Sequence, residues 1–335
     1  MVSEGKSSTC NEKANAGTLS NDSTQHARSD AANQAGSFFV SMKPFLTIDE
    51  QLERLNSHGI RVEEPAFAAQ CLRNLNYYRL RAYWMTFEHD DVVAPGTTFQ
   101  DVWDIYCLDR DVRSWLWNAI EPIELKFRTQ FAYCFAKECG PVAYLDAGHF
   151  ANEADHSKSM DNFRRELSRA RQAGEPCVLH NLEKYGELPV WAAVEIMSMG
   201  LVSNLFGNLQ NERKLDPAAA ETGREIADSF GLSPRNVKSW MHHLCSIRNI
   251  CGHHNRFYNR IMRIRPKLLR RDVQYSGNKE FPTFMVLKRM YERSWPEQWS
   301  ELAERLTGII GRYPGVSLDP MGFPPDWKDV LMGTS

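Results

Sequence analysis

The feature that most constrains the fold of this chain is a long helical pattern between Phe99 and Glu138. Large apolar side chains recur there every three or four residues, which places them along one face of a helix. Pro122 lies inside the pattern. Because proline lacks an N–H and its ring collides with the preceding turn, we expect the helix to bend or divide there. Gly140-Pro141 then marks its end.

Helical patterns also cover most of the chain from residue 43 onward, whereas the alternating pattern of strands is scarce. Thr47 and Glu50 form a capping-box sequence that predicts a helix start, and Ser233-Pro234 predicts another. Further helices are expected over residues 64–74, 159–173, 190–209, 216–230, 284–291 and 297–313, and an ordered extended tail over 315–335. The prediction is an all-α fold in one domain, residues 43–335.

Residues 1–42 differ in composition from the rest of the chain. They are rich in Ser, Asn, Ala, Thr, Asp and Gln and almost lack large apolar side chains. Such a segment cannot bury enough surface to offset the entropy lost on ordering. We therefore predict a disordered N-terminal tail.

Composition narrows the class of protein. The formal net charge of −2 argues against a chain that binds nucleic acid over its whole surface. The eight cysteines form no C-x-x-C pair, which indicates scattered core thiols in a reducing compartment rather than a zinc site. No apolar run is long enough to span a membrane, and no nucleotide-binding or metal-binding motif is present. We expect a cytoplasmic protein without a metal ion or cofactor.

The most informative segment is residues 240–262, which we predict to be one helix. With about 100° per residue, its large apolar side chains fall in a single wedge that faces the core: Trp240, Leu244, Ile247, Cys251, Tyr258 and Met262. The other side carries groups that can bind a phosphate or move a proton: His242, Arg248, Asn249, His253, Arg256, Asn259 and Arg260.

The adjacent histidines of this helix are predicted to differ in role. His254 lies at the edge of the apolar wedge and is expected to be a packed structural residue. His253 lies on the polar face one turn after Asn249, which can hydrogen-bond the imidazole and hold its orientation. Arg248 flanks the same face, and Gly252 between them leaves room for a partner helix or an RNA backbone.

These residue types suit RNA cleavage without a metal ion. The ribose 2′-hydroxyl attacks the neighbouring phosphorus if one group removes its proton and another protonates the leaving oxygen, and a histidine fits either role near neutral pH. Arginine stabilises the negative charge that gathers on the phosphoryl oxygens.

The same predicted helix leads into a local basic stretch. Arg256, Arg260, Arg263 and Arg265 are expected to hold an RNA backbone through phosphate contacts. The alternative, a solvated basic surface that pairs with acidic neighbours, is equally compatible with charge alone.

The chain resembles the Abi proteins of the AbiD/AbiF type, bacterial abortive-infection proteins of the HEPN superfamily of helical RNases. The resemblance is carried by Arg248-Asn249-Ile250-Cys251-Gly252-His253-His254-Asn255-Arg256 with Asn259-Arg260, and by Lys43–Thr47, Leu75–Leu80, Tyr106–Arg110, Ile123–Thr129, Leu188–Ile196 and Met321–Trp327. It covers roughly residues 43–330. One departure is visible, because Gly252 stands where the family motif is expected to have alanine.

The resemblance implies a metal-independent endoribonuclease with an R-N-x-x-x-H motif, acting as a homodimer whose two motif helices line one cleft. Arg248 and His253 would be the catalytic pair and Asn249 their supporting residue. Glu124 and Arg128, on an earlier helix, would lie near the cleft. The resemblance also implies a small structured RNA as a partner.

Two alternatives remain open. The chain would be a non-catalytic RNA-binding module if Arg248 and His253 only contact phosphate. It would instead be a nucleotide-modifying or metal-binding protein if His242, His243, His253 and His254 acted together, but their helical angles scatter them around the axis.

Overall fold

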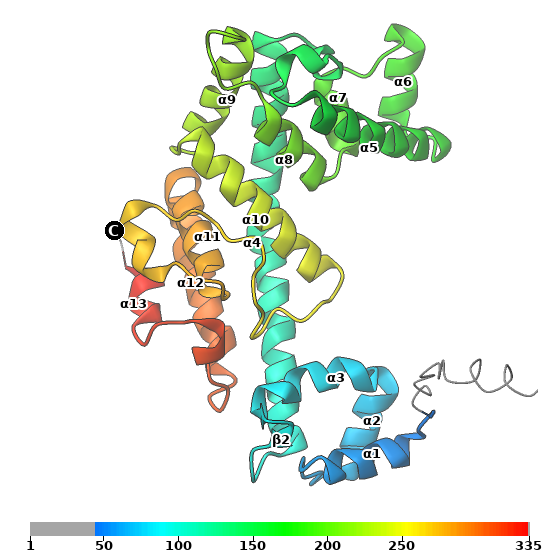
Figure 1. Ribbon diagram of the computed structural model, residues 1–335, viewed down its shortest axis with the longest axis vertical. Helices are drawn as coiled ribbons and strands as arrows, with labels where there is room; N and C mark the ends of the chain where they lie inside the picture. Colours follow the sequence, from blue (N-terminus) through cyan, green and yellow to red (C-terminus); the bar gives the residue numbers. More distant parts are fainter. Residues whose placement is uncertain (1–43, 334–335) are drawn as a thin grey trace, which may run out of the picture. The chain divides into compact units, whose positions relative to one another are not determined.

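The longest element is α4 (Phe99–Glu138), a 40-residue helix that runs through the middle of the fold (Figure 1). The structure is a computed structural model that describes residues 44–333. Thr98 and Asp101 form a capping box that starts the helix. The helix is continuous through Pro122, so of the bend or division predicted there the division does not occur. Side chains buried on both sides of the proline, such as Ile120 and Ile123, hold the helix in one piece.

The prediction of an all-α fold is confirmed for the described residues. The other α-helices are α1 (Ile48–Ser57), α2 (Pro65–Asn74), α3 (Tyr77–Trp84), α5 (Glu153–Gln172), α6 (Pro176–Tyr185), α7 (Val190–Ile196), α8 (Met199–Asn208), α9 (Pro217–Ser229), α10 (Pro234–Gly252), α11 (Phe281–Ser294), α12 (Pro296–Gly311) and α13 (Trp327–Met332). Short 3-10 turns join several of them, and one two-stranded antiparallel sheet pairs β1 (Glu88–His89) with β2 (Val92–Val93).

The core is built around α4. Helices α3, α7, α8, α9, α10, α11 and α12 all pack on it, with α3 near its start and α7 and α9 near its end (Figure 1). Trp115, Phe127, Phe131 and Phe135 of α4 are fully buried. Burial of such large rings contributes most of the stability of a helical core.

The single apolar helix predicted for residues 190–209 is two helices, α7 and α8. Met197 is extended, and the Ser198 side chain accepts a hydrogen bond from the backbone N–H of Leu201, which caps α8. The Arg128 guanidinium donates to the carbonyl oxygens of Val194 and Met197. A tertiary contact thus satisfies carbonyls that a continuous helix would have used internally.

The C-terminal segment is also more regular than the extended tail predicted for it. It contains a 3-10 turn over Asp319–Met321 and then α13, whose Trp327 and Leu331 are buried. The described residues from Thr47 onward belong to one compact unit. The tail predicted for residues 1–42 lies outside the described residues.

Most of the cysteines in residues 44–333 are core thiols, and Cys139 is half-buried. Cys71, Cys107, Cys134, Cys245 and Cys251 are buried, whereas Cys177 on α6 is exposed, contrary to the prediction. Within residues 44–333, no helix combines the length and the apolar character that a membrane crossing requires.

Candidate functional site

Helix α10 carries Arg248 and Asn249 and is followed directly by His253. Ser233 caps its N-terminus by accepting a hydrogen bond from the backbone N–H of Asn236, and Pro234 occupies the first turn, as predicted. Trp240, Leu244 and Ile247 are fully buried against the core. This anchored apolar face fixes which side chains of α10 reach solvent.

The helix ends at Gly252, so the prediction of one helix over residues 240–262 is wrong. The backbone N–H of His254 donates to the Cys251 carbonyl and that of Asn255 to the Ile250 carbonyl. This pair of bonds, with His254 in the left-handed conformation (φ 55°), is the Schellman ending of a helix. His253 is therefore the C-cap.

His254 is exposed rather than packed, which corrects its expected role as a structural core residue. Its part in the fold comes from its backbone, because its carbonyl oxygen accepts a hydrogen bond from the Arg79 guanidinium of α3. The left-handed turn thus redirects the chain away from the helix axis and towards α3.

Asp109 of α4 holds the segment after this turn. Its fully buried carboxylate accepts hydrogen bonds from the backbone N–H groups of Phe257 and Tyr258, at 3.0 and 2.7 Å, and from the side chains of Tyr83 and Arg113, at 2.7 and 3.0 Å. Sequence reasoning missed this role. The available signal was a carboxylate on the apolar face of the α4 pattern, where an ionised group requires partners.

Arg248 lies on the side of α10 that faces α4. Its guanidinium carbon is 4.9 Å from the centre of the Trp117 ring, a cation–π arrangement, and its Nε is 3.7 Å from a carboxylate oxygen of Glu124. The other oxygen of Glu124 accepts hydrogen bonds from Arg128. The structure therefore brings Glu124 and Arg128 beside Arg248.

The Nε of Arg248 is buried and makes no hydrogen bond with the described residues, yet 39% of the side chain is exposed. The guanidinium is held between a ring and a carboxylate while part of it faces solvent. An arginine held in this way keeps its charge and its planar donors available to an anion.

Asn249 and His253 line a hollow of about 370 Å³. α8 contributes Asn204 to this hollow, α10 contributes His242, and the segment after the helix contributes Ile264. Both Asn249 and His253 are exposed at the surface. The hollow places an imidazole and an amide, each able to donate and accept hydrogen bonds, at the surface of one concavity.

Arg248 does not line this hollow. The two residues expected to act as a pair thus occupy adjacent surfaces of one chain, with Gly252 between them. A Cβ atom on Gly252 would lie 3.0 Å from the Trp117 ring. The space expected to admit a partner helix or an RNA backbone is therefore partly filled by Trp117.

The four arginines of the basic stretch divide into two pairs. Arg256 donates to the Ala82 carbonyl and Arg260 to the Arg256 carbonyl, so both guanidinium groups bind the fold itself. Arg263 and Arg265 are exposed. They flank Ile264, which lines the hollow.

Burial decides the chemistry of the neighbouring groups. It lowers the pKa of His243 to about 4, although the hydrogen bond to the Ile264 carbonyl favours the charged form. It raises the pKa of the Cys245 and Cys251 thiols to about 12, so neither is a thiolate nucleophile near neutral pH.

His243 also fails as a metal ligand. Its two ring nitrogens already contact the Ile264 carbonyl and the Thr283 hydroxyl. Within residues 44–333, no group of three or more His, Cys, Asp or Glu side chains is placed to hold a metal ion.

A comparison with known families assigns the chain. The family model of Abi-like proteins matches residues 70–259, more than half of the 335 residues, and the match includes Glu124, Arg128 and the whole of α10. The chain therefore belongs to the Abi-like protein family, which suggests a part in abortive infection, a bacterial defence against phage. No curated protein and no solved structure matches the chain.

Proposed function

We propose that this protein is a metal-independent endoribonuclease of the HEPN type that acts as an abortive-infection toxin. The observation that carries the proposal is the solvent-facing end of α10, where Asn249 and His253 line a hollow and the guanidinium of Arg248, supported by Trp117 and Glu124, lies on the adjacent surface.

The proposed reaction needs only groups that this chain supplies. The 2′-hydroxyl oxygen bonds to the adjacent phosphorus as its proton leaves, the bond from phosphorus to the 5′ oxygen breaks, and that oxygen takes up a proton. The products end in a 2′,3′-cyclic phosphate and a 5′-hydroxyl. His253 carries out one of the two proton transfers, Asn249 orients its ring, and Arg248 stabilises the charge on the phosphoryl oxygens.

The substrate is held by phosphate contacts near the hollow. Arg263 and Arg265 are the two arginines of the basic stretch with exposed side chains, and we assign the backbone contacts to them. Arg256 and Arg260, whose guanidinium groups bind the fold, act by holding the segment in place.

The separation of Arg248 from the hollow supports two further proposals. A homodimer would bring the Arg248 of one copy to the His253 of the other and complete the site. If the protein does not cut RNA, the same surface would serve a non-catalytic module that holds a small structured RNA.

The test uses total RNA in the presence of EDTA. The wild-type protein is expected to produce fragments with 2′,3′-cyclic phosphate ends, and the Arg248→Ala/His253→Ala variant to produce none. A matched control, Arg73→Ala/His89→Ala, removes the same residue types from exposed positions on α2 and β1 and should cut normally. RNA that stays bound but intact with folded wild-type protein would reject the nuclease in favour of the binding module.

A further inference from the structure

A second hollow adjoins the one that contains Asn249 and His253. It lies between α5 and the start of α8, has a volume of about 370 Å³, and shares Gly200 and Asn204 with the first. Because the two hollows share Gly200 and Asn204, they adjoin at α8, and we call the two together the α8 groove. The groove extends the candidate site well beyond α10.

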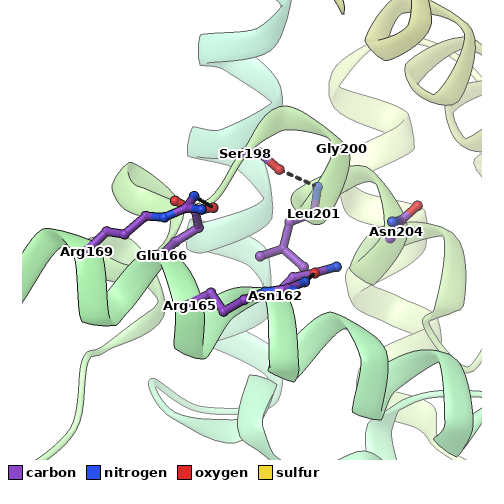
Figure 2. Close-up of a pocket in the computed structure, with 8 residues that line it drawn as sticks. All are labelled: Asn162, Arg165, Glu166, Arg169, Ser198, Gly200, Leu201 and Asn204. Carbon is purple, nitrogen blue, oxygen red and sulfur yellow. Dashed lines mark hydrogen bonds and ion pairs between the residues drawn. The ribbon is translucent and has the colours of Figure 1, made fainter.

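The new part of the α8 groove is basic. Figure 2 shows Arg165 and Arg169 of α5 on one side and the first turn of α8 on the other. The side chain of Arg169 is 72% exposed. Its ion pair with Glu166 is a surface contact, and breaking such a pair costs little free energy. Two arginines against one carboxylate leave this end with a net positive charge.

The basic part of the α8 groove has a defined limit. A third hollow shares Glu166 and Arg169 with the second but also carries the exposed carboxylates of Glu175 and Glu195. Carboxylates repel phosphates, so a polyanion that runs along the groove from His253 is favoured as far as Arg169 and disfavoured beyond it.

Amide side chains line both ends of the α8 groove. Asn162 and Asn204 line its α5 end, and Asn204 and Asn249 its α10 end. An amide can donate and accept hydrogen bonds with the edges of nucleotide bases. Those edges are free in single strands, whereas the deep major groove of an RNA helix keeps them from side chains.

We infer that the α8 groove binds a single-stranded stretch of RNA, with backbone phosphates at Arg165 and Arg169 and the strand continuing past Asn204 to Asn249 and His253. This inference rests on the proposed function, because it takes RNA as the ligand of the α10 hollow. It adds a second binding subsite, on α5, to the proposed site of the chemistry.

Binding is measured in a His253→Ala background so that RNA stays intact. Single-stranded oligonucleotides of about 4 and about 16 nucleotides bracket the usual site sizes of single-strand binders. Arg165→Gln/Arg169→Gln should weaken binding of the long oligonucleotide by about tenfold, leave the short one nearly unchanged, and reduce the salt slope of the long one by about 1.4. The control, Arg164→Gln/Arg171→Gln, removes two exposed arginines of the same helix that line none of these hollows and should have a much smaller effect.

A steric test uses Gly200, which both hollows share. A Cβ atom there meets only the Ser198 hydroxyl, at 3.9 Å, so the site accepts a side chain without internal conflict. Gly200→Leu should obstruct the groove and reduce binding of the long oligonucleotide, whereas Gly200→Ala should bind almost as the parent does. The arginine variants keep the test informative if the leucine variant misfolds.

Three outcomes overturn the inference. The first is that Arg165→Gln/Arg169→Gln and the control Arg164→Gln/Arg171→Gln weaken RNA binding equally, and the second is that Arg165→Gln/Arg169→Gln leaves binding unchanged. The third is that the protein binds an RNA duplex or poly-glutamate as tightly as the single strand. If RNA is cleaved in EDTA and any of these outcomes is observed, the proposed nuclease activity is retained and the RNA-binding role of the α8 groove is rejected. If RNA binding depends on Arg165 and Arg169 but RNA is not cleaved, the RNA-binding role of the α8 groove is retained and the nuclease activity is rejected.

Discussion

At the scale of single residues, His243 shows how burial sets a titration. It lies on α10 with its ring between the Ile264 carbonyl, 2.7 Å from Nδ1, and the Thr283 hydroxyl, 3.0 Å from Nε2. A carbonyl can only accept, so Nδ1 carries the proton and the neutral ring also accepts from Thr283. The buried ring thus joins α10, α11 and the segment after α10.

The stability of the protein should fall in mild acid because of this residue. The pKa of His243 is lowered by burial from 6.5 to about 4, so between those values the unfolded chain binds more protons. The titration of His243 therefore leaves the free energy of unfolding unchanged above about pH 6.5. It lowers that free energy as pH falls towards 4, by about 2 kcal/mol between pH 7 and pH 5. Denaturant unfolding of wild type and His243→Gln at both pH values measures it.

The pH dependence of unfolding must be compared between wild type and His243→Gln, because the titration of Glu280 changes the free energy of unfolding in the opposite direction. Burial raises the pKa of Glu280 to about 8, so the folded chain binds the extra proton and gains stability as pH falls from about 8 to 4.5. Both proteins share this contribution. Identical pH dependence of wild type and His243→Gln would contradict the assignment.

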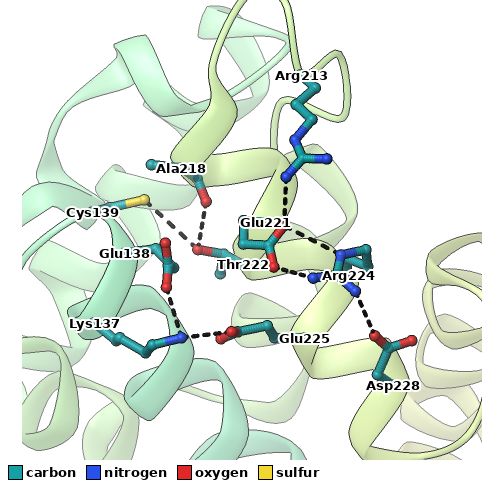
Figure 3. A network of polar contacts seen from close by, with 10 residues as sticks. All are labelled: Lys137, Glu138, Cys139, Arg213, Ala218, Glu221, Thr222, Arg224, Glu225 and Asp228. Carbon is teal, nitrogen blue, oxygen red and sulfur yellow. Dashed lines mark hydrogen bonds and ion pairs between the residues drawn. The ribbon is translucent and has the colours of Figure 1, made fainter.

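At the scale of elements, two kinds of polar contact tie helices to α4. Near its end, Lys137 pairs with Glu225 of α9, beside the pair that Arg224 and Asp228 form within α9 (Figure 3). Such exposed pairs contribute little. The carboxylate of Asp109 is buried and accepts four hydrogen bonds, so its loss should cost far more.

Asp109→Asn should lower the free energy of unfolding by about 3 kcal/mol, because it leaves the buried Arg113 unpaired and removes acceptors from the segment after α10. Denaturant unfolding measures the loss, and hydrogen exchange at the Phe257 and Tyr258 amides should speed up. Asp111→Asn, which removes a carboxylate with surface partners two residues away, should cost less than about 1 kcal/mol. A comparable loss in both variants would show that burial is not the cause.

At the scale of the whole molecule, the position of Arg248 outside the hollow of His253 makes the oligomeric state decisive. If two copies combine one residue each, mixing Arg248→Ala with His253→Ala protein should restore cleavage to about a quarter of the wild-type level, since half of the dimers would each hold one intact site. Mixing Arg248→Ala with the double variant should restore nothing.

The mixing experiment is followed with the RNA cleavage assay and with a measurement of heterodimer formation. Heterodimers that form without regained cleavage would mean that Arg248 and His253 act within one chain, or that the surface only binds RNA. Either result would redirect the mechanism without changing the family assignment.

Local sequence was enough to predict the long helix α4, the caps at Thr47 and Ser233, and the buried face of α10. Periodicity and capping involve residues within a turn or two of one another, so they can be read without knowing the rest of the fold. The resemblance of the motif around Arg248 likewise identified the family before any geometry was known.

Tertiary structure alone decided where α10 ends, where α7 ends, and which polar groups stay available. Asp109, Arg79 and Arg128 lie far in sequence from the backbone groups that they bind. A helix continues or stops according to whether such distant partners satisfy its terminal groups, and an arginine remains available to a ligand only if the fold does not bind it first. Those partners become neighbours only when the chain has folded.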